Sequence, residues 1–199
     1  MKTTKPYHSS SQVRTDNPCI ANSTKQVHEF PPVWDSRSRI LILGSFPSVK
    51  SRELGFYYGH PQNRFWKVLS TIFQEEVPED IPGKRAFLLH HRIALWDVAA
   101  SCTISGSSDS SIRDVTANDI SMILSGSQVS AIFTNGATAL CLYRKLILPQ
   151  TGLEPVLLPS TSPANASWSL DRLCRTWADL IFSQYQSESS PAHRSGIAK

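Results

Sequence analysis

The sequence lacks the cysteine arrangements that hold metal ions or disulfide frameworks. Its four cysteines lie far apart, and none belongs to a CxxC or Cys–His cluster: Cys19, Cys102, Cys141 and Cys174. Zinc and iron–sulfur sites need ligands at short, regular spacing, and disulfide-rich domains need paired cysteines. We therefore expect isolated reduced thiols, no metal site and no other cofactor.

Long apolar runs are also missing. No segment approaches the ~18 consecutive apolar residues that indicate a transmembrane helix. The first ten residues, MKTTKPYHSS, contain no apolar stretch of the kind found in secretory signal peptides. We expect no contact with a membrane and a cytoplasmic location.

The central part of the chain has no excess of one charge. The formal net charge is +4, but residues 31–186 hold 14 Lys and Arg against 13 Asp and Glu. The basic excess lies in the flanks, so the bulk charge alone does not indicate a nucleic-acid partner. Any such surface must come from the local arrangement of side chains.

The polar ends and the patterned centre define the domain organisation. Residues 1–29 are polar without apolar periodicity, and we expect a disordered N-terminal arm; residues 187–199 predict a disordered C-terminal tail. Residues 30–186 are long enough for one domain with a sizeable core. No P-loop of the form GxxxxGK[ST] occurs, which disfavours a nucleotide hydrolase.

Strand-like and helix-like segments alternate in the centre. Four short apolar runs predict strands, at residues 40–43, 93–98, 129–134 and 155–158. Helices are expected at residues 61–73, 84–91, 118–124 (capped by Asn118), 137–146 and 167–182. This alternation predicts an α/β fold: a single three-layer α/β/α domain around a four-stranded, mainly parallel sheet.

Chemistry-bearing residues gather just after the first strand. GSFPS spans residues 44–48, and YYGHPQNRFW, rich in rings and amides, spans residues 57–66. Open α/β sheets bind their ligands at the carboxyl ends of the strands. Aromatic and amide side chains at that place suit a planar ligand with hydrogen-bonding edges, and a nucleobase is the natural candidate.

Four segments together resemble the uracil-DNA glycosylase superfamily. They are GSFPS, YYGHPQNRFW, IFTNGATA at residues 132–139 and LPSTSPAN at residues 158–165. HPxNRFWK is shared with the mismatch-specific uracil glycosylases, whereas GSFPS with YYGHPQN points to the hypoxanthine-DNA glycosylase (DNA-deoxyinosine glycosylase) branch. The resemblance covers about residues 30–183. It implies a metal-independent enzyme of DNA repair that flips deaminated bases out of DNA and hydrolyses their glycosidic bonds.

Two positions depart from other branches of the superfamily. Where those branches place a water-activating Asp or Asn in the first motif, this chain has Phe46, and the position of their second-motif His is Ser160. The resemblance to the hypoxanthine branch then implies that Asn63 orients the water. An amide at the start of a helix can equally serve only to bond the backbone.

The resemblance implies roles for further residues, each with a structural alternative. His60 is a second catalytic candidate, and Tyr58 a base-stacking ring. The other base-binding candidates are Gly44, Ser45, Phe46 and Asn135, and the DNA-backbone candidates are Ser48, Ser160, Ser162 and Asn165. Further candidates for contact with the DNA backbone are the basic residues Lys50, Arg52 and Arg64. Asp97 and Asp109 fall in no matched motif and are not assigned.

Two classes of function remain open. The first is a monomeric DNA glycosylase acting chiefly on hypoxanthine, with uracil or xanthine as alternative bases. The second is a nucleic-acid-binding module that kept the fold and lost catalysis, because the usual acid and histidine are absent at Phe46 and Ser160. In either case the partner is DNA, and a prokaryotic protein of this kind would be associated with the nucleoid.

Overall fold

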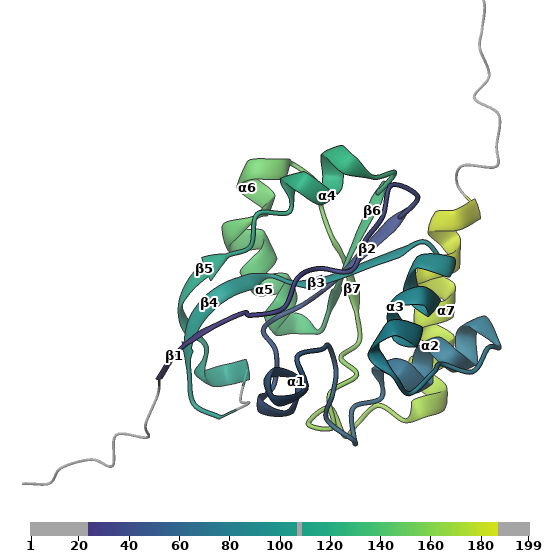
Figure 1. Ribbon diagram of the computed structural model, residues 1–199, viewed down its shortest axis with the longest axis horizontal. Helices are drawn as coiled ribbons and strands as arrows, with labels where there is room; N and C mark the ends of the chain where they lie inside the picture. The colour runs from purple at the N-terminus through teal and green to yellow at the C-terminus, as the bar shows by residue number, and fades with distance from the viewer. Residues whose placement is uncertain (1–23, 107–108, 187–199) are drawn as a thin grey trace, which may run out of the picture.

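A four-stranded parallel sheet forms the centre of the protein. The computed structural model describes residues 24–106 and 109–186 (Figure 1). The sheet has the order β3-β2-β6-β7, with β3 at Ile93–Asp97, β2 at Ile40–Gly44, β6 at Ala131–Asn135 and β7 at Val156–Leu158. All three pairings are parallel. The predicted α/β class and the four-stranded sheet are confirmed.

The central strand β2 is buried on both of its faces, which explains its continuous apolar sequence. Ile40 and Ile42 pack into the core on one face, whereas Leu41 and Leu43 pack into the core on the other. Successive side chains of a strand point to opposite faces. One run of four apolar residues therefore serves both layers of helices.

The helices form a layer on each face of the sheet (Figure 1). One layer holds α2 at Phe65–Phe73, α3 at Ile81–His90 and α7 at Leu170–Gln186. The other holds α4 at Ser121–Gly126, α5 at Ala137–Leu146 and α6 at Leu148–Thr151. The short α1, Val49–Leu54, follows β2. Within the described ranges no helix has the length and hydropathy to cross a membrane.

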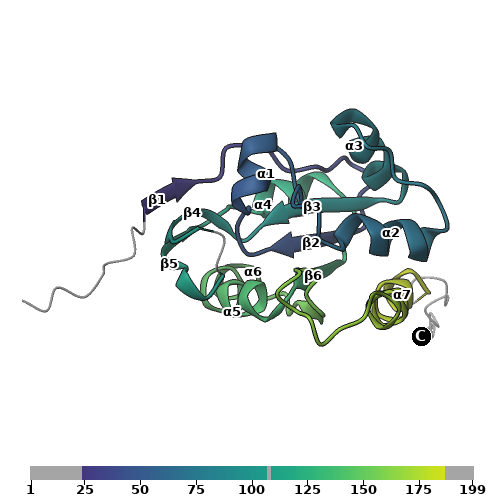
Figure 2. The same ribbon diagram turned by 90° about the horizontal axis from the view of Figure 1, so that it is seen from below.

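A second sheet, absent from the sequence prediction, lies beside the first. It is antiparallel, with the order β1-β4-β5: β1 at Thr24–Val27, β4 at Ala99–Ile104 and β5 at Arg113–Ala117. The single turn of 3-10 helix at Asp109–Ser111 precedes β5. Figure 2 shows β1 and β4 leading away from the end of the parallel sheet that lies opposite α7.

The prediction of a disordered arm over residues 1–29 is wrong for its last part. Residues 24–27 form β1, which pairs with β4, and His28 donates its backbone N–H to Ala100 at 2.8 Å. These contacts join segments more than 70 residues apart, so no local pattern reveals them. The rest of the predicted arm, 1–23, and the predicted tail, 187–199, lie outside the described residues.

All five predicted helices are found, α5 with the predicted bounds and the other four with shifted ends. Asn118 does not cap the helix that follows it. Helix α4 begins at Ser121, whose backbone N–H is accepted by Asp119. The Asn118 amide instead donates to the backbone oxygen of Asp97 at 2.9 Å. Asn118 therefore ties β5 to the carboxyl end of β3, where the candidate site lies.

Candidate active site

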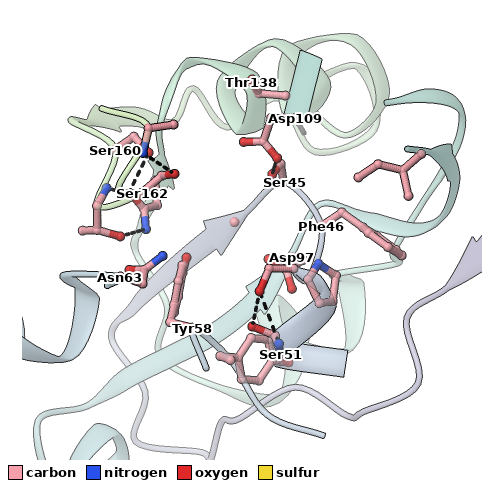
Figure 3. Close-up of a pocket in the computed structure, with 18 of the residues that line it drawn as sticks. Ser45, Phe46, Ser51, Tyr58, Asn63, Asp97, Asp109, Thr138, Ser160 and Ser162 are labelled. Carbon is pink, nitrogen blue, oxygen red and sulfur yellow. Dashed lines mark hydrogen bonds between the residues drawn. The ribbon is translucent and has the colours of Figure 1, made fainter. Parts of the chain in front are cut away.

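A cavity of about 410 Å³ lies at the carboxyl ends of β2, β3 and β6 (Figure 3). Parallel strands end at one edge of the sheet, so loops distant in sequence meet there. Nine residues predicted from the sequence line this cavity: Gly44, Ser45, Phe46, Ser48, Tyr58, Asn63, Asn135, Ser160 and Ser162. The lining also contains residues that sequence reasoning left out, among them Asp97, Asp109, Thr138 and Thr161.

Gly44 and Asp97 form one wall of the cavity in close contact. A Cβ atom on Gly44 would lie 2.1 Å from Asp97 Oδ1 and 3.1 Å from the Tyr58 hydroxyl. The first distance is too short for a methyl group and the second is tight, so glycine fits here without displacing Asp97. The backbone of β2 therefore approaches two functional groups of the cavity directly.

Asp97 is buried and paired with a histidine. Asp97 as a whole is 4% exposed, and its Oδ2 atom lies 2.9 Å from His28 Nε2. His28 is equally buried, among the rings of Phe30, Phe46 and Tyr57. A buried charge needs a partner of this kind. The pair links the segment after β1 to the end of β3.

Tyr58 offers an aromatic ring to the cavity. One face stacks on Phe65, with ring centroids 3.9 Å apart, and the residue holds a left-handed backbone (φ 52°). That conformation is costly for a tyrosine and is maintained by its surroundings. The buried hydroxyl makes no hydrogen bond of normal geometry with the described residues. Burial and the charge of Asp97 raise the pKa of Tyr58, so the hydroxyl remains a donor.

Asn63 stands at the beginning of α2 and also lines the cavity. Its Oδ1 accepts the backbone N–H of Phe65 at 3.0 Å, so the structural role foreseen for this amide is present. The bond leaves the Nδ2 end free to face the cavity (Figure 3). Oδ1 also keeps a second lone pair. The hydrogen bond to Phe65 therefore fixes the amide in place without using up its hydrogen-bonding capacity.

Ser45 and Asp109 meet across the cavity from Asn63 (Figure 3). Ser45 Oγ donates to Asp109 Oδ1 at 2.8 Å. Loss of hydration raises the pKa of Asp109 above its ordinary value; the Ser45 hydrogen bond opposes this shift, and the charge of Asp97 adds to it. The cavity thus contains two carboxylates. They are present although the first motif segment, GSFPS, carries Phe46 where related enzymes have an acid.

Asn135 ties two motif segments together. Its Nδ2 donates to Thr161 Oγ1 at 2.9 Å, and its Oδ1 accepts the Thr161 backbone N–H at 3.0 Å. Next to it, Gly136 has φ 101°, and a Cβ there would lie 3.0 Å from that of Ser160. The predicted base-binding amide is therefore engaged in holding the loop after β7 against the end of β6.

Arg64, one of the basic candidates for the DNA backbone, holds the same loop from the other side. Its guanidinium donates to four backbone carbonyls, those of Thr161, Ser162, Asn165 and Trp168. The half-buried side chain is turned inward by these bonds. A basic residue in a sequence motif is easily mistaken for a phosphate ligand, because sequence does not show which way it points.

His60 and Asn165 lie outside the cavity lining, as do the basic candidates Lys50, Arg52 and Arg64. His60 accepts the backbone N–H of Gln62 at Nδ1, 3.2 Å away. Asn165 donates to the Ser160 carbonyl at 2.9 Å and lines a neighbouring cavity of about 510 Å³, together with Trp168 and Pro159. The two cavities share Asp109, Ser160, Ser162 and Ala164, so they adjoin one another.

The part of the chain that the structure describes contains one cluster of potential metal ligands. Glu75, His90 and His91 bring one ligand atom each to within 4.8 Å of the others. None of the three lines the cavity. His91 stacks on Phe73 and bonds Glu75 at 2.9 Å, which accounts for its place in the fold without a metal.

Comparison with known proteins agrees with this geometry. Residues 31–181 match the model of the uracil DNA glycosylase superfamily. The chain belongs to this superfamily. A protein from Methanosarcina acetivorans named hypoxanthine DNA glycosylase is 39% identical over 145 residues, 72% of this chain and 90% of the relative. One of the same name from Methanosarcina barkeri is 34% identical over 154 residues, 76% of this chain and 96% of the relative.

A solved structure gives the same result for the fold. The solution NMR structure of a uracil DNA glycosylase candidate from Methanosarcina acetivorans superimposes with a TM-score of 0.67 at 35% identity. The match covers 78% of this chain and 96% of that one. The resemblance predicted from the four motif segments is therefore confirmed.

The residues missed by sequence reasoning differ in how they could have been found. Asp97 ends a buried apolar strand, IALWD, and a carboxylate at such a strand end is a recognisable signal. Asp109 and Thr161 carry no comparable signal, because they reach the cavity through contacts with Ser45 and Asn135 that are distant in sequence.

The Arg64 contacts generate a stability prediction. Arg64→Gln should lower the free energy of unfolding by roughly 3 kcal/mol, because four backbone carbonyls, that of the buried Thr161 among them, lose a charged donor. Lys67→Gln, which removes an exposed charge from the same helix, should change it by less than about 0.5 kcal/mol. Urea denaturation followed by circular dichroism measures both. Equal stability of the two variants would show that Arg64 does not hold the loop.

Proposed function

We propose that this protein is a monofunctional DNA glycosylase that removes deaminated bases, chiefly hypoxanthine, from DNA. The observation that carries the proposal is the cavity at the sheet edge, where Tyr58 and Asn63 from one motif segment meet Gly44 from another. Similarity to two relatives named hypoxanthine DNA glycosylase supports hypoxanthine as the main base. Aromatic side chains and a few polar groups line the cavity together, as a site for a nucleobase requires.

A base buried in a duplex must leave the stack to reach such a cavity. Tyr58, which lines the cavity and rests one ring face on Phe65, is placed to stack on the flipped base. Ser48, Ser160 and Ser162 lie at the same cavity and can hold phosphate oxygens through hydroxyl and backbone donors. Recognition thus combines a ring that favours planar ligands with hydroxyls that hold the strand.

Hydrolysis then needs a positioned water and a stabilised sugar cation. Asn63 orients the water, because its amide is fixed by Phe65 and still offers Nδ2 and a lone pair of Oδ1. The carboxylates of Asp97 and Asp109 give the cavity negative charge, which favours the cation that forms as the base departs. A strong base is not required, which is compatible with Phe46 at the position of the usual acid.

Uracil and xanthine remain alternative substrates, because they share the amide-like edge of hypoxanthine. A binding module without catalysis is the competing class, favoured only by the missing acid at Phe46 and the missing histidine at Ser160. We infer further that the working unit is a monomer acting on DNA in the cytoplasm, at the nucleoid in a prokaryote.

The first test is base release. The protein should liberate free hypoxanthine from an oligonucleotide with one deoxyinosine, and alkali should then cleave the abasic site. Activity should persist in EDTA, because the only metal-ligand cluster within residues 24–106 and 109–186 lies away from the cavity. Binding without release would favour the binding module, whereas strand cleavage without alkali would indicate an amine nucleophile.

The second test is Asn63. Asn63→Ala should slow single-turnover release by about two orders of magnitude, the scale seen when one preorganised polar group is lost. Stability should fall by only ~1 kcal/mol, because the lost contact is a helix-start hydrogen bond. Asn63→Asp is the matched variant, because it keeps an acceptor for Phe65 and replaces the donor that faces the cavity. A near-normal rate for Asn63→Ala would place the chemistry elsewhere, with His60 tested next.

A further inference from the structure

The buried pair of His28 and Asp97 has no role in the hydrolysis beyond its charge, yet it lies at the cavity. The side chains are 1% and 6% exposed, and one hydrogen bond of 2.9 Å joins them. Burying a carboxylate and an imidazole costs free energy. A contact with a purely structural role at this place does not require that these polar groups be buried. The pair therefore invites a functional explanation.

The direction of the hydrogen bond follows from the chemistry of the two groups. An ionised carboxylate can only accept, so His28 Nε2 donates its hydrogen to Asp97 Oδ2. His28 Nδ1 is buried and has no partner among the described residues. The rings of Phe30, Phe46 and Tyr57 surround the imidazole and prevent it from turning away. His28 therefore fixes one carboxylate oxygen of Asp97 and with it the plane of the group.

The other oxygen, Asp97 Oδ1, is directed along the cavity wall. It lies so close to Gly44 that a Cβ there would be 2.1 Å away, and Asp97 lines the cavity. Over the described ranges, no donor is hydrogen-bonded to Oδ1. The wall thus presents a single, rigidly held acceptor of a hydrogen bond.

Base edges differ at the position that such an acceptor would read. Hypoxanthine, uracil and xanthine carry a hydrogen on the ring nitrogen beside the carbonyl that deamination creates. Adenine and cytosine carry a lone pair at the corresponding ring nitrogen, which a carboxylate repels. Guanine and thymine have the same ring N–H and are not distinguished by this contact.

We propose that Asp97, positioned by His28 from the segment after β1, reads the ring N–H that distinguishes hypoxanthine and the other deaminated bases from adenine and cytosine. The inference rests on the proposed function and assigns its base selectivity to a pair outside the four motif segments. Asp97 touches the base, whereas His28 acts through Asp97 as a positioning residue. The segment after β1 is then part of the specificity site.

The direct test compares two bases that differ at this edge. Matched oligonucleotides carry either hypoxanthine or unsubstituted purine, which has a lone pair at the ring nitrogen. Single-turnover release by the wild-type protein should favour hypoxanthine. In Asp97→Asn the amide oxygen accepts from His28 and the NH₂ group faces the base, so the preference should fall about 10- to 100-fold. Differences in leaving ability between the bases cancel in this comparison of variant with wild type.

Variants of His28 separate positioning from a merely structural role. His28→Gln retains an N–H donor for Asp97 and should keep most of the preference for hypoxanthine. His28→Leu retains apolar bulk within the aromatic rings but loses the donor, and should reduce the preference. The control is His91→Leu, which breaks a second histidine–carboxylate hydrogen bond of 2.9 Å, away from the cavity. It should leave the preference unchanged.

Failure of this inference can be told from failure of the proposed function. If the wild type releases hypoxanthine but Asp97→Asn and His28→Leu keep its preference, the inference is overturned. If no base is released, the proposed function is wrong, and NMR titration with free hypoxanthine and free purine decides the inference. Tighter binding of hypoxanthine, lost in Asp97→Asn, supports it; equal binding overturns it.

Discussion

The close approach of Asp97 to the Cα atom of Gly44 is the constraint on which the rest of the site depends. A side chain at residue 44 would meet Asp97 Oδ1 at 2.1 Å and the Tyr58 hydroxyl at 3.1 Å. Because residue 44 is glycine, the ends of β2 and β3 can stand side by side with a carboxylate between them. The cavity wall, the position of Tyr58 and the reach of His28 to Asp97 all follow from this one contact.

The site compensates for an unusual first motif with groups from other elements. Phe46 supplies no acid, but Asp97 from the end of β3 and Asp109 from the loop before β5 bring carboxylates to the cavity. Phe46 instead packs against His28 and so helps to hold Asp97. Phe46, which stands where other branches have a catalytic acid, is thus placed to support Asp97. Asp97 supplies the negative charge that this acid would have carried.

The sequence predicted the parallel sheet and most motif residues because these depend on local patterns. Apolar runs define β2, β3 and β6, and the segments after them reach the same edge by the geometry of parallel strands. The antiparallel sheet was missed because β1 is polar and is held only by pairing with β4. The inward direction of Arg64 and the bonded state of Asn135 were missed because both depend on the loop after β7.

The central claim is that a deaminated base enters this cavity, with Tyr58 against its face and Asp97 at its edge. The most direct measurement is a crystal structure with DNA that carries deoxyinosine on a 2′-fluorinated sugar, which resists base loss. The account predicts hypoxanthine within the cavity beside Gly44, its ring N–H bonded to Asp97 Oδ1 and the glycosidic carbon facing Asn63. A base bound in the neighbouring cavity against Trp168, or left stacked in the duplex, would contradict it.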